Sequence, residues 1–413
     1  MIEVGEAQRL LLEEAQVLGA SEAGLAEALG RVLAEDVRAD RDLPAGDVST
    51  MDGFALRARD VPASGAVLRI AGEVRAGQAP GTLSVSAGSA IRILTGALVP
   101  SGADAVAMVE LTREDREAGT VEIRERPEAG QNIRRRGEDV RAGGTILERG
   151  GVIHAAEIAA LATVGRTRVR AFRPPAVRIV STGDEVIEAE RTPREHQVRN
   201  SNAHSLLAQL REMGIEGTYL GIAPDDPEAL EGMLRRGLLG DVLLVTGGVS
   251  AGTHDLVKAT LARLGLRLVF HGVAVRPGKP ILAGRCEGCL VVGLPGNPVS
   301  TFTAFAVFVA PVLRKMMGHR RPHAIEVRAI LAERLARRPG RTTFHLARLE
   351  FVNGRPVARP VRTMGSGDAI SLSRANAFVV APGAQEALEP GAEVTALPWN
   401  DFFLRCSASM ERS

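Results

Sequence analysis

The run Val242-Leu243-Leu244-Val245-Thr246-Gly247-Gly248 leads from four apolar residues directly into a glycine loop. Two further runs have the same form: Ile179-Val180 precedes Ser181-Thr182-Gly183, and Val291-Val292 precedes Gly293-Leu294-Pro295-Gly296. Short, wholly apolar runs are typical of strands that are buried on both faces of a sheet. Helical patterns over 202–213, 227–239, 255–264 and 299–317 accompany these runs. The alternation predicts a central doubly wound, mostly parallel α/β domain.

The sequence on either side of this α/β segment has a different pattern of expected helices and strands. Helical patterns over 7–18 and 154–164 enclose short β-like runs that are separated by Gly, Pro and Asp. Beyond residue 324 the pattern is again β-like, and Asn353-Gly354 is a strong signal for a tight hairpin. We therefore expect a multidomain α/β plus β chain. Its parts are a discontinuous helical domain (1–48 and 141–173), an inserted β-rich domain (49–140), the α/β domain (174–322) and a C-terminal β domain (323–413).

Composition restricts the classes to which the protein can belong. A chain of 413 residues predicts two or three domains or more. The charge balance of +2 and an aromatic content of 3% argue against a nucleic-acid partner. Three cysteines indicate a reducing compartment, and residues 1–6 lack the pattern of a signal peptide. The longest apolar stretch, 299–313, is shorter than the roughly 18 residues of a membrane span, so we expect a cytoplasmic protein without a membrane partner.

The loops that follow the predicted strands are the first candidates for a binding site. In a parallel sheet these loops all emerge at the carboxyl edge of the strands, where α/β proteins bind ligands. Glycines before a helix expose free backbone N–H groups, and the helix dipole favours an anion there. Neither a Walker A sequence nor a Rossmann fingerprint is present. We therefore expect a phosphate-bearing ligand held in some other way.

Acidic residues follow the same strands and suggest a metal ion. Glu185, Asp225 and Asp255 would repel a bound phosphate unless a cation lay between them. Mg²⁺ fits, because it binds one or two carboxylates together with phosphate oxygens and water. Each acid taken alone could equally be a helix cap or a solvated surface residue, and Asp226 before Pro227 has the pattern of a cap. Their convergence on one sheet edge favours magnesium.

Lys279 is a candidate anion ligand. Only three of the 51 basic residues are lysines, namely Lys258, Lys279 and Lys315. Lys279 lies in Arg276-Pro277-Gly278-Lys279-Pro280, where two prolines restrict the backbone. A fixed ammonium aimed at an anion is the functional interpretation, and a rigid turn is the structural one.

Other conspicuous features favour structural interpretations. Cys286-Glu287-Gly288-Cys289 has the spacing of a redox or zinc motif, but it spans a turn before a strand and no second cysteine pair exists. The charged run 134–139 is typical of a solvated face, and Asp52-Gly53 is typical of a turn.

Several blocks occur in a fixed order and are specific as a set. Together, from about residue 7 to about residue 382, they resemble the molybdopterin molybdenumtransferases of the MoeA type, a family also seen in the C-terminal part of gephyrin. The blocks are Ser49-Thr50-Met51-Asp52-Gly53, Leu94-Thr95-Gly96-Ala97, Arg134-Arg135-Arg136-Gly137-Glu138-Asp139, Ser181-Thr182-Gly183-Asp184-Glu185, Thr246-Gly247-Gly248-Val249-Ser250 with Gly252 and Asp255, Pro277-Gly278-Lys279-Pro280, and Gly293-Leu294-Pro295-Gly296-Asn297-Pro298-Val299-Ser300.

The resemblance implies a reaction. Molybdate is inserted into the dithiolene of adenylylated molybdopterin and AMP is released, with Mg²⁺ as the cofactor. It also implies a homodimer whose cleft is formed by the α/β domain of one subunit and the inserted β-rich domain of the other. Molybdopterin adenylyltransferases and molybdoenzymes are implied as candidate protein partners.

The resemblance also implies roles for individual residues. It makes Asp52, Glu185, Asp225, Asp255 and Lys279 catalytic, with Glu185, Asp225 and Asp255 as metal ligands. The implied substrate-binding residues are Thr95, Arg134, Asp139, Gly247, Gly248, Ser250, Pro295, Pro298, Ser371 and Arg374. The chain departs from the family pattern at 198–202, which lacks a usual tyrosine and aspartate, and at Arg276, where lysine is common.

Two other functions stay open at this point. The related adenylyltransferases share the α/β domain and use ATP, but they lack the additional domains expected here. A non-catalytic scaffold, a role that gephyrin also has, is disfavoured by the acids at 52, 185, 225 and 255. The sequence does not distinguish molybdate from tungstate.

Overall fold

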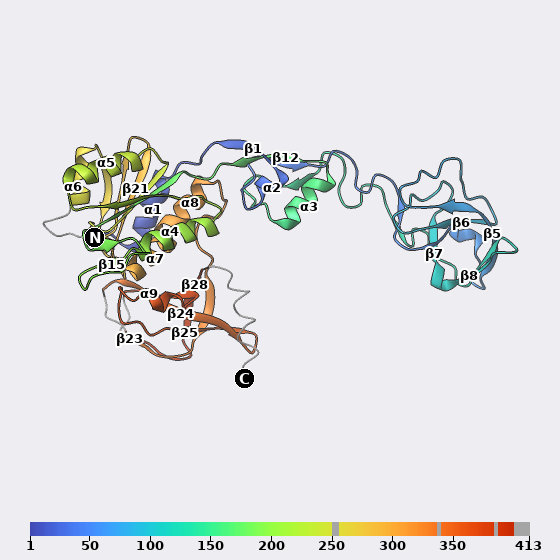
Figure 1. The fold of residues 1–413 in the computed structure, drawn as a ribbon. Coiled ribbons are helices and arrows are strands. Elements are labelled where there is room, and N and C mark those ends of the chain that lie inside the picture. The colour runs from blue at the N-terminus through green and yellow to red at the C-terminus, as the bar shows by residue number, and fades with distance from the viewer. Residues whose placement is uncertain (250–255, 337–339, 384–386, 400–413) are drawn as a thin grey trace. The chain divides into compact units, whose positions relative to one another are not determined.

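The computed structural model describes residues 1–249, 256–336, 340–383 and 387–399. It divides into two compact units, which Figure 1 draws. The larger unit comprises Met1–Ala34, Gly150–His154 and Arg168–Ser413, and the smaller comprises Glu35–Arg149 and Ala155–Thr167. These units do not correspond one to one with the four expected domains, so the boundaries of those domains stay a prediction.

The larger unit contains the expected α/β sheet. Its strand order is β16-β13-β17-β21-β20-β18, and the first four strands are parallel. The last two pair antiparallel, which the sequence did not lead us to expect. A two-residue turn at Glu287 (φ 48°) and Gly288 (φ 87°) produces this reversal between β20 and β21. The strands are β13 (Val177–Thr182), β16 (Thr218–Ala223), β17 (Val242–Thr246), β18 (Arg267–His271), β20 (Leu282–Cys286) and β21 (Cys289–Leu294).

Helices cover both faces of this sheet, as the doubly wound prediction requires. Alternate residues of β17 enter different cores: Leu244 packs in the same cluster as Leu206, whereas Leu243 packs in the same cluster as Leu230 and Leu261. This separation explains why the strand is apolar at every position. The helices are α4 (Ser201–Glu212), α5 (Pro227–Gly237), α6 (Leu256–Arg263), α7 (Pro298–Ala304) and α8 (Ala310–Met316).

The last helical stretch is longer than expected. It runs without interruption from Pro298 to Met316 through a π-helical turn at Phe305–Val309. By length and composition these 19 residues, with a mean hydropathy of 1.3, could cross a membrane, so the expectation that the apolar stretch is too short was wrong. However, 78% of the apolar window is buried inside the fold, which identifies it as a core helix.

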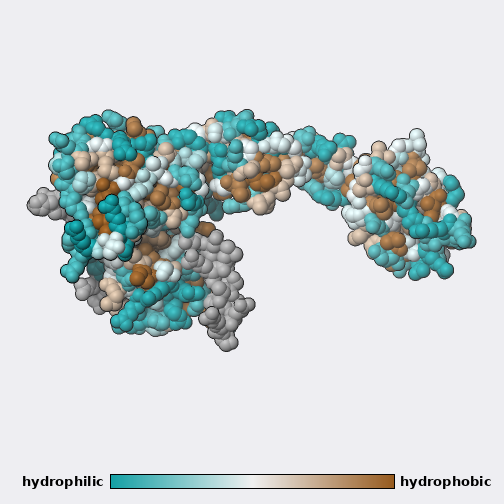
Figure 2. Space-filling model, in the orientation of Figure 1, coloured by the Kyte–Doolittle hydropathy of each residue, from teal (hydrophilic) through white to brown (hydrophobic). Residues whose placement is uncertain are grey.

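Hydrophilic residues predominate on the face shown in Figure 2.

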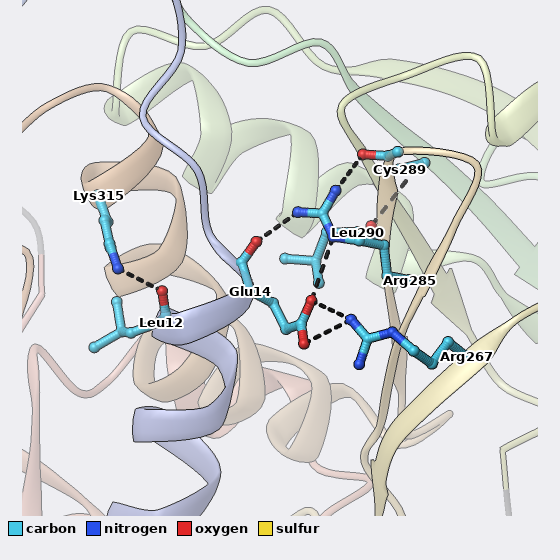
Figure 3. A network of polar contacts seen from close by, with 8 residues as sticks. Leu12, Glu14, Arg267, Arg285, Cys289, Leu290 and Lys315 are labelled. Carbon is cyan, nitrogen blue, oxygen red and sulfur yellow. Dashed lines mark hydrogen bonds and ion pairs between the residues drawn. The ribbon is translucent and has the colours of Figure 1, made fainter.

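The N-terminal helix α1 (Val4–Glu14) is fixed to the α/β sheet at its C-terminal end, as Figure 3 shows. The Glu14 carboxylate accepts hydrogen bonds of 2.6 and 2.8 Å from Arg267 and one of 3.3 Å from Arg285. Lys315 Nζ donates to the carbonyl oxygen of Leu12 at 2.6 Å. A cation thus binds the carbonyl end of the helix, where the helix dipole favours it.

The C-terminal part of the larger unit is a small barrel. Its strands follow the order β24-β25-β22-β28-β26, and β24 also pairs with β26. The hairpin predicted at Asn353-Gly354 is confirmed, with positive φ angles at both residues. The short strand β19 (Val275–Arg276) adds to β24 and so joins the 276–280 loop to the barrel. The barrel strands are β22 (Val327–Leu331), β24 (Thr342–Val352), β25 (Arg355–Pro360), β26 (Ala377–Ala381) and β28 (Glu393–Pro398).

The smaller unit is built on a six-stranded sheet of order β7-β4-β6-β5-β9-β8. Two apolar clusters lie in this unit, one around Phe54 and the other around Ile91. The short pair β3 (Val48–Ser49) and β10 (Ile133–Arg134) adjoins the segments that carry the expected site residues. The sheet strands are β4 (Gly53–Leu56), β5 (Ala66–Val74), β6 (Ser89–Ile93), β7 (Ala105–Met108), β8 (Thr112–Asp115) and β9 (Thr120–Ile123).

Candidate functional site

The loops after β13, β17 and β21 meet at the carboxyl edge of the α/β sheet. Gly247 N–H donates to the carbonyl oxygen of Leu294 at 3.1 Å. A Cβ atom on Gly247 would lie 2.8 Å from the Thr182 carbonyl oxygen, and one on Gly296 would lie 3.7 Å from Gly247 Cα. With φ angles of 88° and 62°, Gly247 and Gly248 also adopt a backbone conformation that favours glycine. Both glycines are therefore required by local geometry, and their backbone groups lie beside the other two loops.

The acidic residues at this edge come from adjacent strands β13 and β16. Glu185 is exposed, and its carboxylate lies over Gly183, where an added Cβ would approach Oε2 to 2.4 Å. The Asp225 N–H donates to Asp184 Oδ1 at 3.0 Å, which joins the two acidic loops. Asp184 was not among the predicted residues, although it directly precedes Glu185. Asp226 caps α5 by accepting from Ala229 N–H at 2.9 Å, as predicted.

The predicted metal ligands are only partly described. Asp255 and Ser250 lie outside the described residues. Within the residues that the structure describes, no group of three His, Cys, Asp or Glu side chains is arranged to hold a metal. The exposed carboxylates of Glu185 and Asp225 offer oxygen ligands of the kind that Mg²⁺ prefers, with room for water and phosphate oxygens. Magnesium binding therefore stays a prediction, and Glu185 and Asp225 are compatible with it.

A cavity of about 670 Å³ lies between the 276–280 loop and the C-terminal barrel. Lys279 lies on its wall and is exposed, and its ammonium group makes no hydrogen bond or ion pair with the described part of the chain. Arg276 and Arg341 also line the cavity, and its described lining contains no Asp or Glu. The basic side chains in this lining give the cavity a positive potential that suits an anion.

The sequence analysis identified only part of this lining. Pro295 lies on the cavity wall, as expected, but Pro298 lines a separate, smaller hollow beside Asn202. Arg276 had been noted only as a departure from the family pattern, whereas Arg341 and His345 were not predicted at all. They lie on β24 or just before it, and the pairing of β24 with β19 brings them to the loop. No local motif marks these residues in the sequence.

In the C-terminal block, the residues at the cavity are not the two that were predicted. Ser371 is 1% exposed, and its hydroxyl donates to the Asp368 carbonyl oxygen at 2.7 Å within the turn that starts α9 (Ala369–Leu372). Arg374 is exposed, and it is absent from the described cavity lining. Ser366 lines the cavity instead, and Asn297 Nδ2 donates to its hydroxyl at 2.9 Å.

The smaller unit brings the predicted residues together in two pairs. Thr95 donates two hydrogen bonds to Asp52, through its backbone N–H at 2.7 Å and its hydroxyl at 2.8 Å. These bonds, the backbone bond most of all, lower the pKa of Asp52 below its ordinary value. Arg134 forms a two-point ion pair with Asp139, of which the Nε bond measures 3.0 Å. Ser49 links the two pairs. It is the strand partner of Ile133, which precedes Arg134, and its carbonyl oxygen accepts a hydrogen bond from the N–H of Gly96, which follows Thr95.

The charged run 134–139 is more organised than the solvated face that its sequence suggested. Arg135 bonds to Asp47 at 2.6 Å, and Arg136 bonds to Asp42 at 2.7 Å. Each of the three arginines therefore has its own aspartate. Because two of these aspartates come from residues 42–47, the ion pairs fix the run against a distant segment of the chain.

The stretch 198–202, which lacks the family's usual tyrosine and aspartate, contacts a tyrosine from another segment of the chain. Asn200 Nδ2 donates to the Tyr219 hydroxyl at 2.8 Å and to Ser181 Oγ at 3.0 Å. The Tyr219 hydroxyl in turn donates to Glu188 at 3.0 Å. Burial, followed by the bond to Glu188, raises the pKa of Tyr219 to about 12. The Tyr219 hydroxyl therefore links Asn200 to the Glu188 carboxylate.

The two cysteines of the C-x-x-C sequence are adjacent residues of a hairpin. Cys286 pairs with Cys289 in the β20–β21 register, and both are 1% exposed. Burial raises the pKa of both thiols, that of Cys289 to about 12. The reactive thiolate is therefore strongly disfavoured at neutral pH.

Comparisons with known proteins agree with this architecture. Family profiles match residues 2–165 (MoeA N-terminal region, domains I and II), 178–315 (probable molybdopterin binding domain) and 328–399 (MoeA C-terminal region, domain IV). The chain is 35% identical to the molybdopterin molybdenumtransferase of Bacillus subtilis, over 90% of this chain and 88% of that protein. It is 33% identical to the enzyme of Haemophilus influenzae, over 97% and 99% of the two chains.

A solved structure shows the same likeness over the whole chain. The molybdopterin biosynthesis MoeA protein from Pyrococcus horikoshii superposes with a TM-score of 0.83 at 30% identity, covering 97% of this chain and all of that one. Sequence motifs, family profiles and three-dimensional architecture thus agree along nearly the entire length. The chain belongs to the molybdopterin molybdenumtransferases, the MoeA family of transferases.

Proposed function

We propose that this protein inserts molybdate into adenylylated molybdopterin and releases AMP in a magnesium-dependent reaction. The observation that carries the proposal is the cavity lined by Arg276, Lys279 and Arg341 without a described acidic residue. It shares Pro295 and Gly296 with the loop that meets the glycine loop at the sheet edge. An oxyanion bound there would lie near a ligand held by the glycine loop, which is the arrangement that transfer between the two requires.

The glycine loop would bind the phosphate of the adenylylated substrate. Backbone N–H groups at Gly248 and Ser250 are the donors that we assign to it, and Gly247 would contact the phosphate as part of the same turn while its own N–H is bonded to Leu294. Glu185, Asp225 and Asp255 would hold Mg²⁺, which when bound neutralises phosphate charge and polarises the bond to the leaving AMP. Lys279 stabilises and orients the oxyanion as a point charge.

We extend the proposal to a cytoplasmic homodimer. The family resemblance supports it, since the family's cleft uses the inserted β-rich domain of the second subunit. Asp52, Thr95, Arg134 and Asp139 would act there on the substrate bound to the partner. Mixing an inactive Asp52→Ala variant with an inactive Asp255→Ala variant should restore part of the activity through heterodimers. If subunits exchange and no activity returns, the shared cleft is wrong.

The reaction is tested by supplying purified protein with adenylylated molybdopterin, Mg²⁺ and molybdate. The proposal predicts one AMP released for each active cofactor formed. An adenylyltransferase would instead consume ATP and molybdopterin, and a scaffold would convert neither pair of substrates. Running the assay with tungstate in place of molybdate determines which oxyanion is preferred.

A further inference from the structure

Each of the three lysines has a distinct environment. Lys315 binds the end of α1, and Lys279 lies on the wall of the cavity. Lys258 Nζ lies 3.3 Å from Nδ1 of His271, a residue that the reaction proposed above does not use. The other ring nitrogen of His271, Nε2, lies 3.3 Å from the carbonyl oxygen of Val249. Lys258, His271 and Val249 therefore form a continuous chain of hydrogen bonds.

One form of the His271 ring satisfies both contacts. An ammonium group can only donate, and a carbonyl oxygen can only accept. Nδ1 must therefore accept from Lys258, and Nε2 must carry the proton that is donated to Val249. This is a neutral imidazole in a single tautomer, and the two neighbours together select it.

The contacts close the base of the glycine loop. Val249 directly follows Gly247-Gly248, and Lys258 is the third residue of α6, so the two stand at opposite ends of the connection that contains Ser250 and Asp255. The ends also pack directly, since a Cβ on Gly248 would lie 2.6 Å from Val257 Cγ2. Val249 itself is 2% exposed and packs over Gly293, where an added Cβ would lie 2.6 Å from Cγ1. His271, which lies on β18, thus joins Val249 to Lys258 at the start of α6.

We propose that Lys258 and His271 are positioning residues that fix the described start of the glycine loop, Gly247 to Val249, relative to α6 for ligand binding. This inference rests on the proposed function, because it assumes that the loop binds the phosphate of the adenylylated substrate. Neither side chain need touch the substrate: they act by fixing the backbone at Val249 relative to α6. Backbone groups that are fixed before a ligand arrives lose less conformational entropy when they bind it. Loss of the contacts should therefore weaken binding of adenylylated molybdopterin while leaving the oxyanion cavity unchanged.

Kinetics of four variants test whether Lys258 and His271 affect the binding of adenylylated molybdopterin and not the oxyanion cavity. His271→Leu and Lys258→Met should each raise the KM for adenylylated molybdopterin about three- to tenfold, as loss of one hydrogen bond does. Neither should change kcat or the molybdate concentration for half-maximal rate. His271→Gln should retain the parental KM, because its amide offers one acceptor and one donor as the neutral ring does. Lys315→Met is the matched control, since it removes a lysine that binds α1, and it should leave this KM unchanged.

Amide hydrogen exchange gives a second measurement that does not depend on activity. The peptide spanning 247–257 should exchange faster in His271→Leu and in Lys258→Met than in the parent, with no further increase in the double variant. If the parent shows no turnover but amide exchange follows this pattern, the proposed function is wrong and the positioning role of Lys258 and His271 is supported. If turnover occurs but exchange and KM are unchanged in both variants, or if His271→Gln behaves like His271→Leu, the positioning role is wrong.

Discussion

Thr95 donates two hydrogen bonds to one carboxylate oxygen of Asp52, from its backbone N–H at 2.7 Å and from its hydroxyl at 2.8 Å. Asp52 stands immediately before β4, where Gly53 allows an approach to β7 so close that an added Cβ would lie 1.9 Å from the Ala107 carbonyl oxygen. The geometry of the sheet therefore fixes the backbone at Asp52, and the bonds from Thr95 orient its carboxylate and lower its pKa.

Replacing Thr95 by valine tests the second of these bonds. The backbone N–H remains in Thr95→Val, so the pKa of Asp52 should rise only part of the way towards that of an ordinary aspartate. Carboxyl carbon chemical shifts across an acid titration measure this change. Because the Asp52 pKa is lowered in the folded state, any stability it contributes is present above the ordinary aspartate pKa and is lost as pH falls through the lowered value. An unchanged Asp52 titration in Thr95→Val would show that the hydroxyl bond has no effect.

Glu14→Gln should weaken the attachment of α1 to the α/β sheet. The hydrogen bonds from Arg267, more than those from Arg285, hold the pKa of Glu14 below its ordinary value. Removing the charge from this two-arginine contact should cost about 1 kcal/mol at neutral pH, because Arg267 is exposed and solvent screens the pair. Since the pKa is lowered, the difference from the parent should shrink as pH falls through the lowered pKa of the parent carboxyl group. Urea unfolding over a series of pH values from neutral to acid measures it, and a pH-independent difference would contradict the explanation.

Tyr219 offers a direct optical measurement, because it is the only tyrosine in the chain. The absorbance of its tyrosinate should develop with a midpoint near pH 12 in the folded protein. Glu188→Gln should lower that midpoint, since it removes the second-largest cause of the shift while burial remains. The raised pKa implies stabilisation that is complete below the ordinary tyrosine pKa of about 10 and is lost as pH rises through the folded value. A parental midpoint near 10 would mean that the ring is not held between Asn200 and Glu188.

The cysteine pair should be dispensable for the reaction. The Cys286→Ser/Cys289→Ser variant should keep the metal content and turnover of the parent, although two buried hydroxyls should lower its stability. In the native parent, both thiols should react with an alkylating reagent far more slowly than after unfolding, since burial raises their pKa values. Stoichiometric zinc that disappears from the double variant would instead establish a metal site at the hairpin.

The sequence was most informative where a local signal determines the structure. The apolar run at 242–245 predicted a buried parallel strand, Asp226-Pro227 predicted a helix cap, and Asn353-Gly354 predicted a hairpin; all three are confirmed. Each is determined by residues that are adjacent in the chain. The antiparallel strand β20 was missed because its direction depends on the turn at Glu287-Gly288, which had been noted only as part of the cysteine motif.

Long-range contacts explain what the sequence could not reveal. Arg341 reaches the cavity because β24 pairs with β19, a pairing between residues 67 positions apart in the chain. The contact between Lys258 and His271 likewise depends on how α6 packs near β18, although the scarcity of lysine had singled out Lys258. Ser371 resembled a binding residue by position, but the structure places its hydroxyl inside a turn. Motifs thus identified the loops and, with them, Lys279 and Pro295 at the cavity, whereas Arg341 and His345 required the fold.

The assignment of cation and anion to separate residues is the central claim, and one assay tests it most directly. AMP release is measured in parallel titrations of Mg²⁺ and molybdate for the parent, Asp225→Asn, Asp255→Asn and Lys279→Met. Either aspartate variant should need more Mg²⁺ and be partly rescued by it, because each has lost a hard oxygen ligand. Lys279→Met should need about tenfold more molybdate, as loss of a charged hydrogen bond predicts, and magnesium should not rescue it. Unchanged Mg²⁺ dependence in both aspartate variants, or parental activity of Lys279→Met at limiting molybdate, would contradict the account.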